Sequence, residues 1–199
     1  MSGFLPESEI SIILGAIIFI TVGLSIYLPW KKKASAIGVI TTSVIVVFML
    51  QLLFTSDLLY DLPLFDSIDK LTHSQLVTDL GLNPETIIHD QSLYQMVTSM
   101  YLHGDFLHLI FNFVGLIFLG IQLERKIGWY RFLILYYGSG IIGGAIVLMV
   151  SPFGQLGHGM NVVSIGASGA IFGIIGGYWL LYPKDKIFFP LPLFLIRMY

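Results

Sequence analysis

The sequence contains no cysteine and few charged residues. The lack of cysteine excludes disulfide bonds, thiolate metal sites and cysteine nucleophiles. Charged residues make up 11% of the chain, against about 25% in soluble domains. No long basic run is interleaved with aromatic residues, so the sequence gives no support for nucleic-acid binding. With 56% hydrophobic residues and a mean hydropathy of +0.86, the composition is that of a membrane protein.

Five apolar runs are close to the roughly 20 residues that a helix needs to cross a bilayer. They are residues 10–28, 34–54, 106–123, 132–150 and 164–182. A sixth run, 187–199, contains Arg197 and is expected to form an incomplete last span. The first run follows Glu7 and Glu9 instead of basic residues, so it predicts a retained helix and not a signal peptide. Together the runs predict an all-α fold, a polytopic membrane helix bundle.

Charge alternates between the connecting loops. Basic residues follow the first, third and fifth runs, at Lys31, Lys32, Lys33, Arg125, Lys126, Arg131, Lys184 and Lys186. The long segment 55–105 carries eight acidic residues and one lysine, Lys70. Because lysine and arginine concentrate in cytoplasmic loops, we expect a multi-pass protein of the cell membrane with its N-terminus and segment 55–105 outside. Loop 151–163 would then also lie outside, immediately before Ser168.

Residues 166–169 read Gly-Ala-Ser-Gly, inside a stretch (132–183) without aspartate, glutamate, lysine or arginine. Ser168 is expected near the outer N-terminus of its helix, where unpaired backbone N–H groups can stabilise an oxyanion. Gly166 and Gly169 leave room for a peptide or a helix to approach the hydroxyl. The alternative is a packing face of small residues: Gly166, Ala170 and Gly173, or Gly169, Gly173 and Gly177.

His108 and Asn112 lie four residues apart, on one face of the predicted helix 106–123. Inside a bilayer their polar groups need partners. One interpretation is that both side chains donate to an oxyanion; the other is an interhelical hydrogen bond between two helices. The first interpretation predicts that Ser168, His108 and Asn112 share one water-accessible pocket below the outer surface.

The remaining titratable residues are expected to play lesser parts. His103 is expected in a loop, bonded to backbone groups, and His158 would reach Ser168 only if its loop folded back. His73 and His89 are expected to be solvated or interfacial. Glu124 and Arg125 are interpreted as ordinary interfacial charges, with an ion pair between helix ends as the alternative. No metal is predicted, because no acid–histidine pair has the helical spacing of a zinc site.

Several of these segments resemble those of rhomboid intramembrane serine proteases. Residues 97–112 (VTSMYLHGDFLHLIFN) resemble the His-x-x-x-Asn helix of the family, and 166–173 (GASGAIFG) resemble its nucleophile helix. Between them, 123–128 (LERKIG) and the glycines at 138, 140, 143 and 144 resemble the intervening segments, so the resemblance covers about 92–185 in order. It implies that Ser168 is the nucleophile and that His108, Asn112 and the Ser168 N–H bind the oxyanion.

The resemblance also implies an organisation and a reaction. Residues 1–33 would be an extra N-terminal transmembrane helix with a basic cytoplasmic loop, and 34–199 the rhomboid-like membrane domain. The implied function is an intramembrane serine endopeptidase that cuts transmembrane proteins near their outer helix ends, without a cofactor. The alternatives are a non-catalytic rhomboid-like protein that binds transmembrane helices and a transporter or channel. A transporter is disfavoured because the sequence has no visible inverted repeat or intramembrane charge pair.

The sequence departs from the family pattern at two places. Where the family usually carries Trp-Arg in the first outer loop, the nearest position reads Tyr94-Gln95. The family's general base is a histidine on a sixth core helix, and no histidine here occupies the matching place. A serine is a weak nucleophile without a base. We therefore expect either a C-terminally truncated sequence or an inactive product, with little or no hydrolysis by the 199-residue chain.

Overall fold

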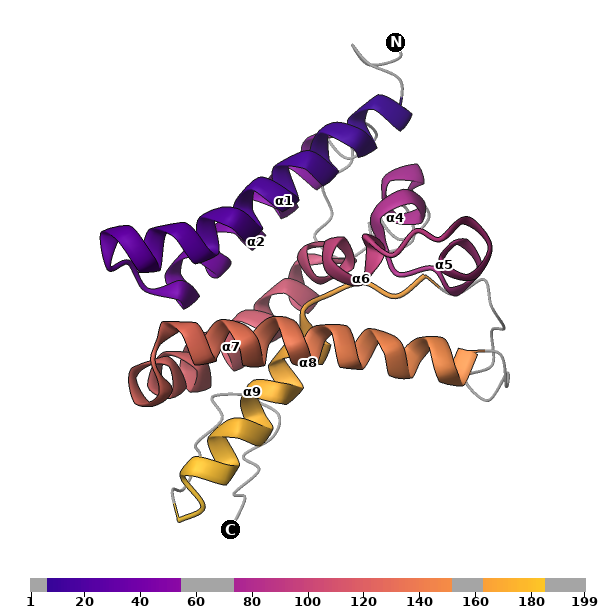
Figure 1. Cartoon of the computed structure of the whole chain (residues 1–199). Coiled ribbons are helices and arrows are strands. Elements are labelled where there is room, and N and C mark those ends of the chain that lie inside the picture. Colours follow the sequence, from indigo (N-terminus) through magenta and orange to yellow (C-terminus); the bar gives the residue numbers. More distant parts are fainter. Residues whose placement is uncertain (1–6, 55–73, 152–162, 185–199) are drawn as a thin grey trace.

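The computed structural model describes residues 7–54, 74–151 and 163–184 (Figure 1). The long helices are α1 (Glu7–Lys32), α2 (Ala36–Phe54), α7 (Phe106–Ile127) and α8 (Trp129–Val150). Short helices α4 (Gln75–Leu80), α5 (Pro84–Asp90), α6 (Gln95–Thr98) and the 3-10 turn η1 (Ser99–Tyr101) precede α7, and α9 (Ser168–Leu181) follows α8. The predicted incomplete span 187–199 lies outside the described residues.

The all-α prediction is confirmed for the part of the chain that the structure describes. The four long helices are long and apolar enough to cross a membrane. The fifth predicted span, 164–182, is shorter than expected, because α9 has only 14 residues and begins at Ser168. Residues before it are extended: Ser164 exchanges two backbone hydrogen bonds with Leu82, both at 2.9 Å, in an antiparallel bridge.

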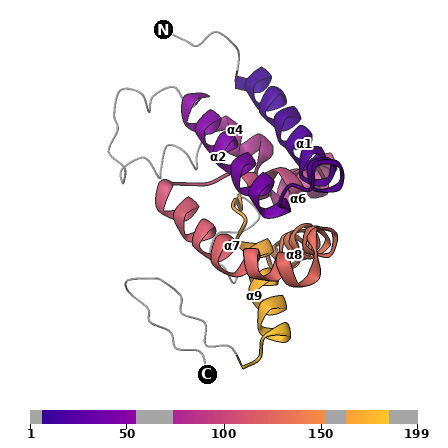
Figure 2. The ribbon, with the colours of Figure 1, turned by 90° about the vertical axis from the view of Figure 1, so that its left-hand side faces the viewer.

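Helices α1 and α2 lie side by side on one side of the bundle, with α7, α8 and α9 on the other (Figures 1 and 2). Helix α1 is part of the core, since Leu14 and Ile18 are fully buried. A chain of hydroxyl groups joins it to α8 and to the 3-10 turn η1. Ser25 Oγ lies 2.9 Å from Tyr137 Oη, which in turn lies 2.8 Å from Tyr101 Oη. The first helix is therefore packed and hydrogen-bonded as an integral element.

Glu124, near the end of α7, caps the N-terminus of α2. Its carboxylate accepts hydrogen bonds from the backbone N–H groups of Ala36 (2.7 Å) and Ile37 (3.0 Å), and from Ser35 Oγ (2.7 Å). The interpretation of Glu124 as an ordinary interfacial charge is therefore wrong. Unpaired N–H groups and the dipole at the start of a helix favour a carboxylate there, even one from a distant helix.

Glycines bring α8 and α9 into backbone contact. A Cβ atom placed on Gly143 would lie 3.2 Å from Gly169 Cα, and one on Gly173 would collide with the Ser139 side chain. At the far end, a Cβ on Gly177 would lie 2.8 Å from a Leu135 methyl. The packing interpretation is therefore correct for Gly169, Gly173 and Gly177, as is usual for small residues between membrane helices. Gly166 lies before the helix and has a different surrounding.

Candidate active site

Helix α7 presents His108 and Asn112 on one face, and its start is set by Asp105. The Asp105 side chain accepts from the His108 backbone N–H at 2.8 Å, which is the usual N-cap arrangement. His108 lies less than one turn from the cap and is partly buried; Asn112 is buried, with 7% of its surface exposed. The Asn112 Nδ2 atom has no hydrogen-bond partner among the described residues. A buried amide donor of this kind is unfavourable until an acceptor arrives.

Gly166 is the point at which these two side chains meet the serine segment. A Cβ atom on Gly166 would lie 2.6 Å from His108 Nε2 and 3.4 Å from Asn112 Nδ2. Gly166 has φ of +112°, a conformation that residues with a Cβ rarely adopt. Both the space and the backbone therefore require glycine here, and its backbone lies directly against the imidazole and the amide.

The extended segment before Ser168 is attached by three backbone hydrogen bonds to the loop between α2 and α7, the first loop. Besides the two between Leu82 and Ser164, the Gly166 N–H donates to the Ser99 carbonyl at 2.8 Å. Gly81 allows this close approach, because a Cβ there would collide with Val163 and lie 2.5 Å from the Val77 carbonyl oxygen. The loop therefore determines the position at which α9 begins.

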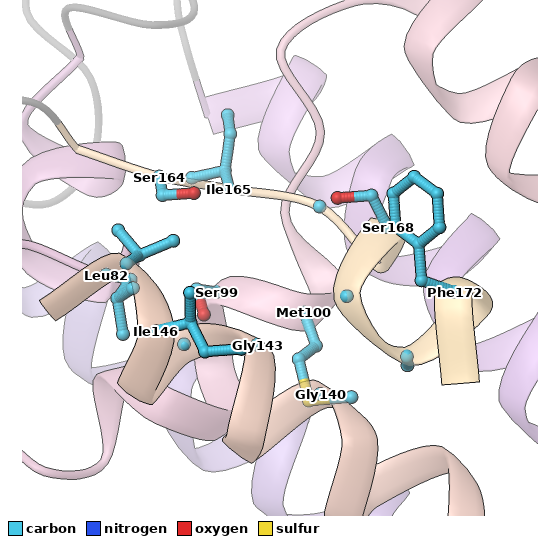
Figure 3. A pocket seen from close by; sticks show the side chains of 15 residues that line it. Leu82, Ser99, Met100, Gly140, Gly143, Ile146, Ser164, Ile165, Ser168 and Phe172 are labelled. Atoms are coloured by element: carbon cyan, nitrogen blue, oxygen red, sulfur yellow. The ribbon is translucent and has the colours of Figure 1, made fainter. Parts of the chain in front are cut away.

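Ser168 is the first residue of α9 and its side chain is exposed. Ala167 forms no side-chain cap, so no side chain occupies the N–H groups of the first turn. Ser168 lines a cavity of about 230 Å³ between the first loop, α8 and α9. In Figure 3, Ser168 and Phe172 lie on one side of this cavity, and Leu82, Ser99 and Ile146 on the other.

The structure brings the predicted residues to one region but not into one cavity. His108 and Asn112 do not line the cavity that contains Ser168; Gly166 lines it and also contacts both side chains. Among the described residues, no hydrogen bond joins the Ser168 hydroxyl to either side chain. The cavity that Ser168 lines in the described part of the chain is therefore not the predicted common pocket, and Gly166 is the residue that lies next to both groups.

His103 lies in the loop before α7, as predicted, and is fully buried. Its Nδ1 atom is 3.3 Å from the Tyr101 carbonyl, and its ring packs edge-on against His108 with 5.1 Å between centroids. Gln51 on α2 makes two hydrogen bonds with the His103 backbone, at 2.9 and 3.2 Å. Burial, and then the neighbouring His108, lower the pKa of His103 to about 3, so the imidazole is neutral at pH 7.

Gln95 holds together the loop on which the serine segment rests. In the sequence this residue is noted only as a difference from the usual Trp-Arg of the family. Its side chain is 1% exposed. Gln95 Oε1 accepts from the Asn83 N–H (3.1 Å) and from Thr86 Oγ1 (3.0 Å), and its Nε2 donates to the Asp79 carbonyl (3.1 Å). Tyr94 Oη donates to the same carbonyl at 3.0 Å. The Tyr-Gln pair thus anchors this loop through neutral hydrogen bonds.

The remaining titratable candidates are not part of this site. His89 is exposed on α5, and His73 and His158 lie outside the described residues. Over residues 7–54, 74–151 and 163–184, no cluster of three or more histidine or acidic side chains is arranged to hold a metal ion.

The sequence matches a known protein family. Residues 90–198 match the Rhomboid domain family model, which is more than half of the chain. This chain belongs to the rhomboid family. It is therefore an integral, multi-pass membrane protein, consistent with its four long apolar helices.

Individual rhomboid relatives match part of the chain. Putative rhomboid protease YdcA of Bacillus subtilis is 40% identical over 85 residues, which cover 43% of this chain and 39% of that protein. Rhomboid protease GluP of the same organism is 33% identical over 111 residues, or 56% of this chain and 20% of that protein. Inactive RHOMBOID-like protein 8 of Arabidopsis thaliana is 31% identical over 96 residues, or 48% and 25%.

The chain thus spans well under half the length of these rhomboid relatives. Two of the three have protease in their names and one is named inactive, so membership of the family does not decide activity. No solved structure gives a match.

Proposed function

We propose that this rhomboid protein is an intramembrane serine endopeptidase in which Ser168 is the nucleophile. The observation that carries the proposal is the Asn112 amide, which is buried, has no partner among the described residues and points at Gly166, two residues before Ser168. A negatively charged oxygen beside Gly166 would satisfy this donor. The nitrogen of His108 on the same face is a second donor for that oxygen.

In the proposed reaction, Ser168 Oγ bonds to the carbonyl carbon of a peptide and its proton passes to a base. The carbonyl oxygen becomes an oxyanion held by His108, Asn112 and the Ser168 backbone N–H at the start of α9. The C–N bond then breaks, the amine leaves with a proton, and an acyl-enzyme remains. Water attacks this ester and releases the acid. Gly166 and Gly169 keep side chains away from the approaching peptide.

The proposed substrates are transmembrane proteins cut near their outer helix ends. The described contacts support this orientation. Glu124 bonds to Ser35, and Lys126 lies over the Tyr182 ring, so the basic ends of α1, α7 and α9 gather at one end of the bundle. Basic ends face the cytoplasm in most membrane proteins. Ser168, at the other end of α9, would then face the outside, as would the N-terminus and segment 55–105.

The second candidate is a pseudoprotease that binds transmembrane helices without cutting them. It is favoured by one observation: among the described residues, no side chain hydrogen-bonds the Ser168 hydroxyl and could act as its base. Residues 185–199 contain no histidine, and the only histidines of the sequence outside the described residues are His73 and His158. We therefore expect little or no hydrolysis by the 199-residue chain unless a base is supplied.

Chemical rescue distinguishes the two candidates. The purified chain is incubated with a fluorophosphonate probe, with and without millimolar imidazole as an external base. An oxyanion site predicts labelling of Ser168 that rises with imidazole, disappears in Ser168→Ala and falls at least tenfold in Asn112→Ala. The control is Ser43→Ala, a buried polar residue on α2 outside this site. No labelling at any imidazole concentration, or equal labelling in Asn112→Ala, would support the pseudoprotease.

A further inference from the structure

A second hollow lies where α1 ends and α2 begins, beside the basic end of α7, and shares no lining residue with the cavity of Ser168. It has a volume of about 760 Å³ and is lined by residues of α1, the α1–α2 turn, α2, α7 and α8. Two basic side chains, Lys33 and Arg125, and two tryptophans, Trp30 and Trp129, are among its lining. Tryptophan and basic residues at a helix end are typical of the membrane–water interface.

The single acidic residue of this lining, Glu124, is hydrogen-bonded to the start of α2. Glu124 accepts three hydrogen bonds from the start of α2, at 2.7 to 3.0 Å. Its charge is therefore directed at the N-terminus of α2. Lys33 and Arg125 are both exposed, and neither forms an ion pair within the described residues. The lining carries two cations and one carboxylate, and that carboxylate is turned toward the start of α2, so Lys33 and Arg125 leave a positive excess that is complementary to an anion.

Lys33 has a backbone conformation that is unfavourable for a residue with a Cβ atom. It has φ of +53°, in the left-handed region where helices usually end with glycine or asparagine. A residue with a Cβ in this conformation costs about 1–2 kcal/mol relative to a right-handed one. The turn itself therefore gives no reason for a lysine, whereas an anion in the hollow does.

The hollow continues into an apolar groove between α1 and α2. This groove has a volume of about 500 Å³ and shares Ala34, Ser35 and Gly38 with the hollow. Its far lining includes Leu24 and Val46, which are 39% and 44% exposed. From Gly38 to Val46 the groove follows α2 for about 12 Å, at about 1.5 Å per residue. One leaflet of hydrocarbon is about 15 Å thick, half of a core of about 30 Å.

We propose that the basic hollow and the groove together bind one anionic phospholipid. Its phosphate lies against Lys33 and Arg125, and one acyl chain lies along the groove between α1 and α2. The pairing of a charged hollow with an apolar groove of one leaflet's length selects a lipid over a soluble anion. Basic pockets between membrane helices are known to bind anionic headgroups. This site is independent of the proposed protease function.

The test uses the full 199-residue chain, delipidated in detergent, and counts bound lipid by native mass spectrometry. The probes are phosphatidylglycerol and phosphatidylcholine with identical chains, and inorganic phosphate as a competitor. We expect phosphatidylglycerol to bind at least tenfold more tightly than phosphatidylcholine. Millimolar inorganic phosphate should displace it less than twofold. Equal affinity for the two lipids, or full displacement by phosphate, would overturn the proposal.

Two matched pairs of variants separate the site from general attraction. Lys33→Gly with Arg125→Gln removes two charges from the hollow and should abolish the tenfold preference. Arg131→Gln with Lys184→Gln removes two exposed charges outside its lining and should leave the preference within twofold. Equal losses in both double variants would mean diffuse electrostatic attraction and would reject the site.

A second matched pair of variants tests the apolar groove. A Cβ on Gly38 meets only Ser35 within 4 Å, so Gly38→Leu should fill the groove without disturbing the backbone and weaken binding of both lipids at least fivefold. Gly23→Leu places the same side chain at an exposed position of α1, where a Cβ meets nothing within 4 Å. This variant should leave the affinity for both lipids unchanged. Because Lys33→Gly relieves the left-handed turn, its melting temperature should be unchanged or higher. Lys33→Gly alone is therefore measured as well, and a loss of its preference for phosphatidylglycerol cannot be attributed to unfolding.

Discussion

Glu124 Oε1 accepts a hydrogen bond from the Ala36 backbone N–H at 2.7 Å, which joins the end of α7 to the start of α2 across 88 residues of sequence. Glu124→Ala should lower the free energy of unfolding by about 0.5–2 kcal/mol, the usual range for a lost N-cap. Reversible unfolding in mixed micelles measures this. Arg131→Ala is the control, an exposed residue near the start of α8. Equal stability of Glu124→Ala and the unmodified protein would show that the cap contributes nothing.

Gly166→Ala should abolish imidazole-dependent probe labelling of Ser168 almost completely, by at least tenfold. The new methyl group would lie 2.6 Å from His108 Nε2, and the backbone at φ of +112° disfavours any Cβ. Gly176→Ala is the matched control, because a Cβ there meets nothing within 4 Å and alanine favours a helix by about 0.5–1 kcal/mol. Retained labelling in Gly166→Ala would mean that the contact of Gly166 with α7 is not needed for reactivity.

Gln95→Leu should destabilise the first loop, because the buried Asn83 N–H loses its acceptor and the Asp79 carbonyl keeps only the hydrogen bond from Tyr94 Oη. The unpaired buried N–H group costs about 1–3 kcal/mol. Hydrogen exchange measured by mass spectrometry should rise over residues 79–86. It should not rise over the α8 helix. Gln75→Leu, at an exposed position on α4, should leave the same peptides protected. The idea that Gln95 anchors the loop fails if both variants exchange alike.

Acidification should destabilise the protein through His103. Its folded pKa of about 3 lies below the ordinary value of 6.5, so between these pH values the unfolded chain binds the extra proton. Stability from this group is complete above pH 6.5 and falls by about 1.4 kcal/mol per unit as the pH drops toward 3. His103→Phe keeps an aromatic ring but cannot titrate, so its unfolding free energy should lack this slope. His89→Phe, at an exposed site, should retain it.

Much of the helical frame follows from apolar length alone. The predicted runs 34–54, 106–123 and 132–150 became α2, α7 and α8, since a bilayer allows a long apolar segment few structures other than a helix. The run 164–182 has the same composition but its first residues are extended. Their backbone bonds go to Leu82 and Ser99, which lie far away in the sequence, so the start of α9 could not be read from local hydropathy.

Among the site residues too, local features could be predicted from the sequence and long-range contacts could not. The four-residue spacing of His108 and Asn112 on one helix face is a local property, and it could be predicted. Gln95 and Glu124 act on groups 9 to 88 positions away, and a single sequence does not contain that pairing. The roles of these two side chains depend on backbone groups from other segments, which become their neighbours only in the folded protein.

The backbone contact between Gly143 and Gly169 has a mechanical consequence. It lies one residue from Ser168 and involves no side chain that could change rotamer, so α8 holds this end of α9 at a fixed point. Toward Leu181 the contact passes to flexible leucine side chains, such as Leu135 against Gly177. Tilting of α9 within the bilayer would therefore pivot about its first turn, and the hydroxyl would stay almost still while the far end swings.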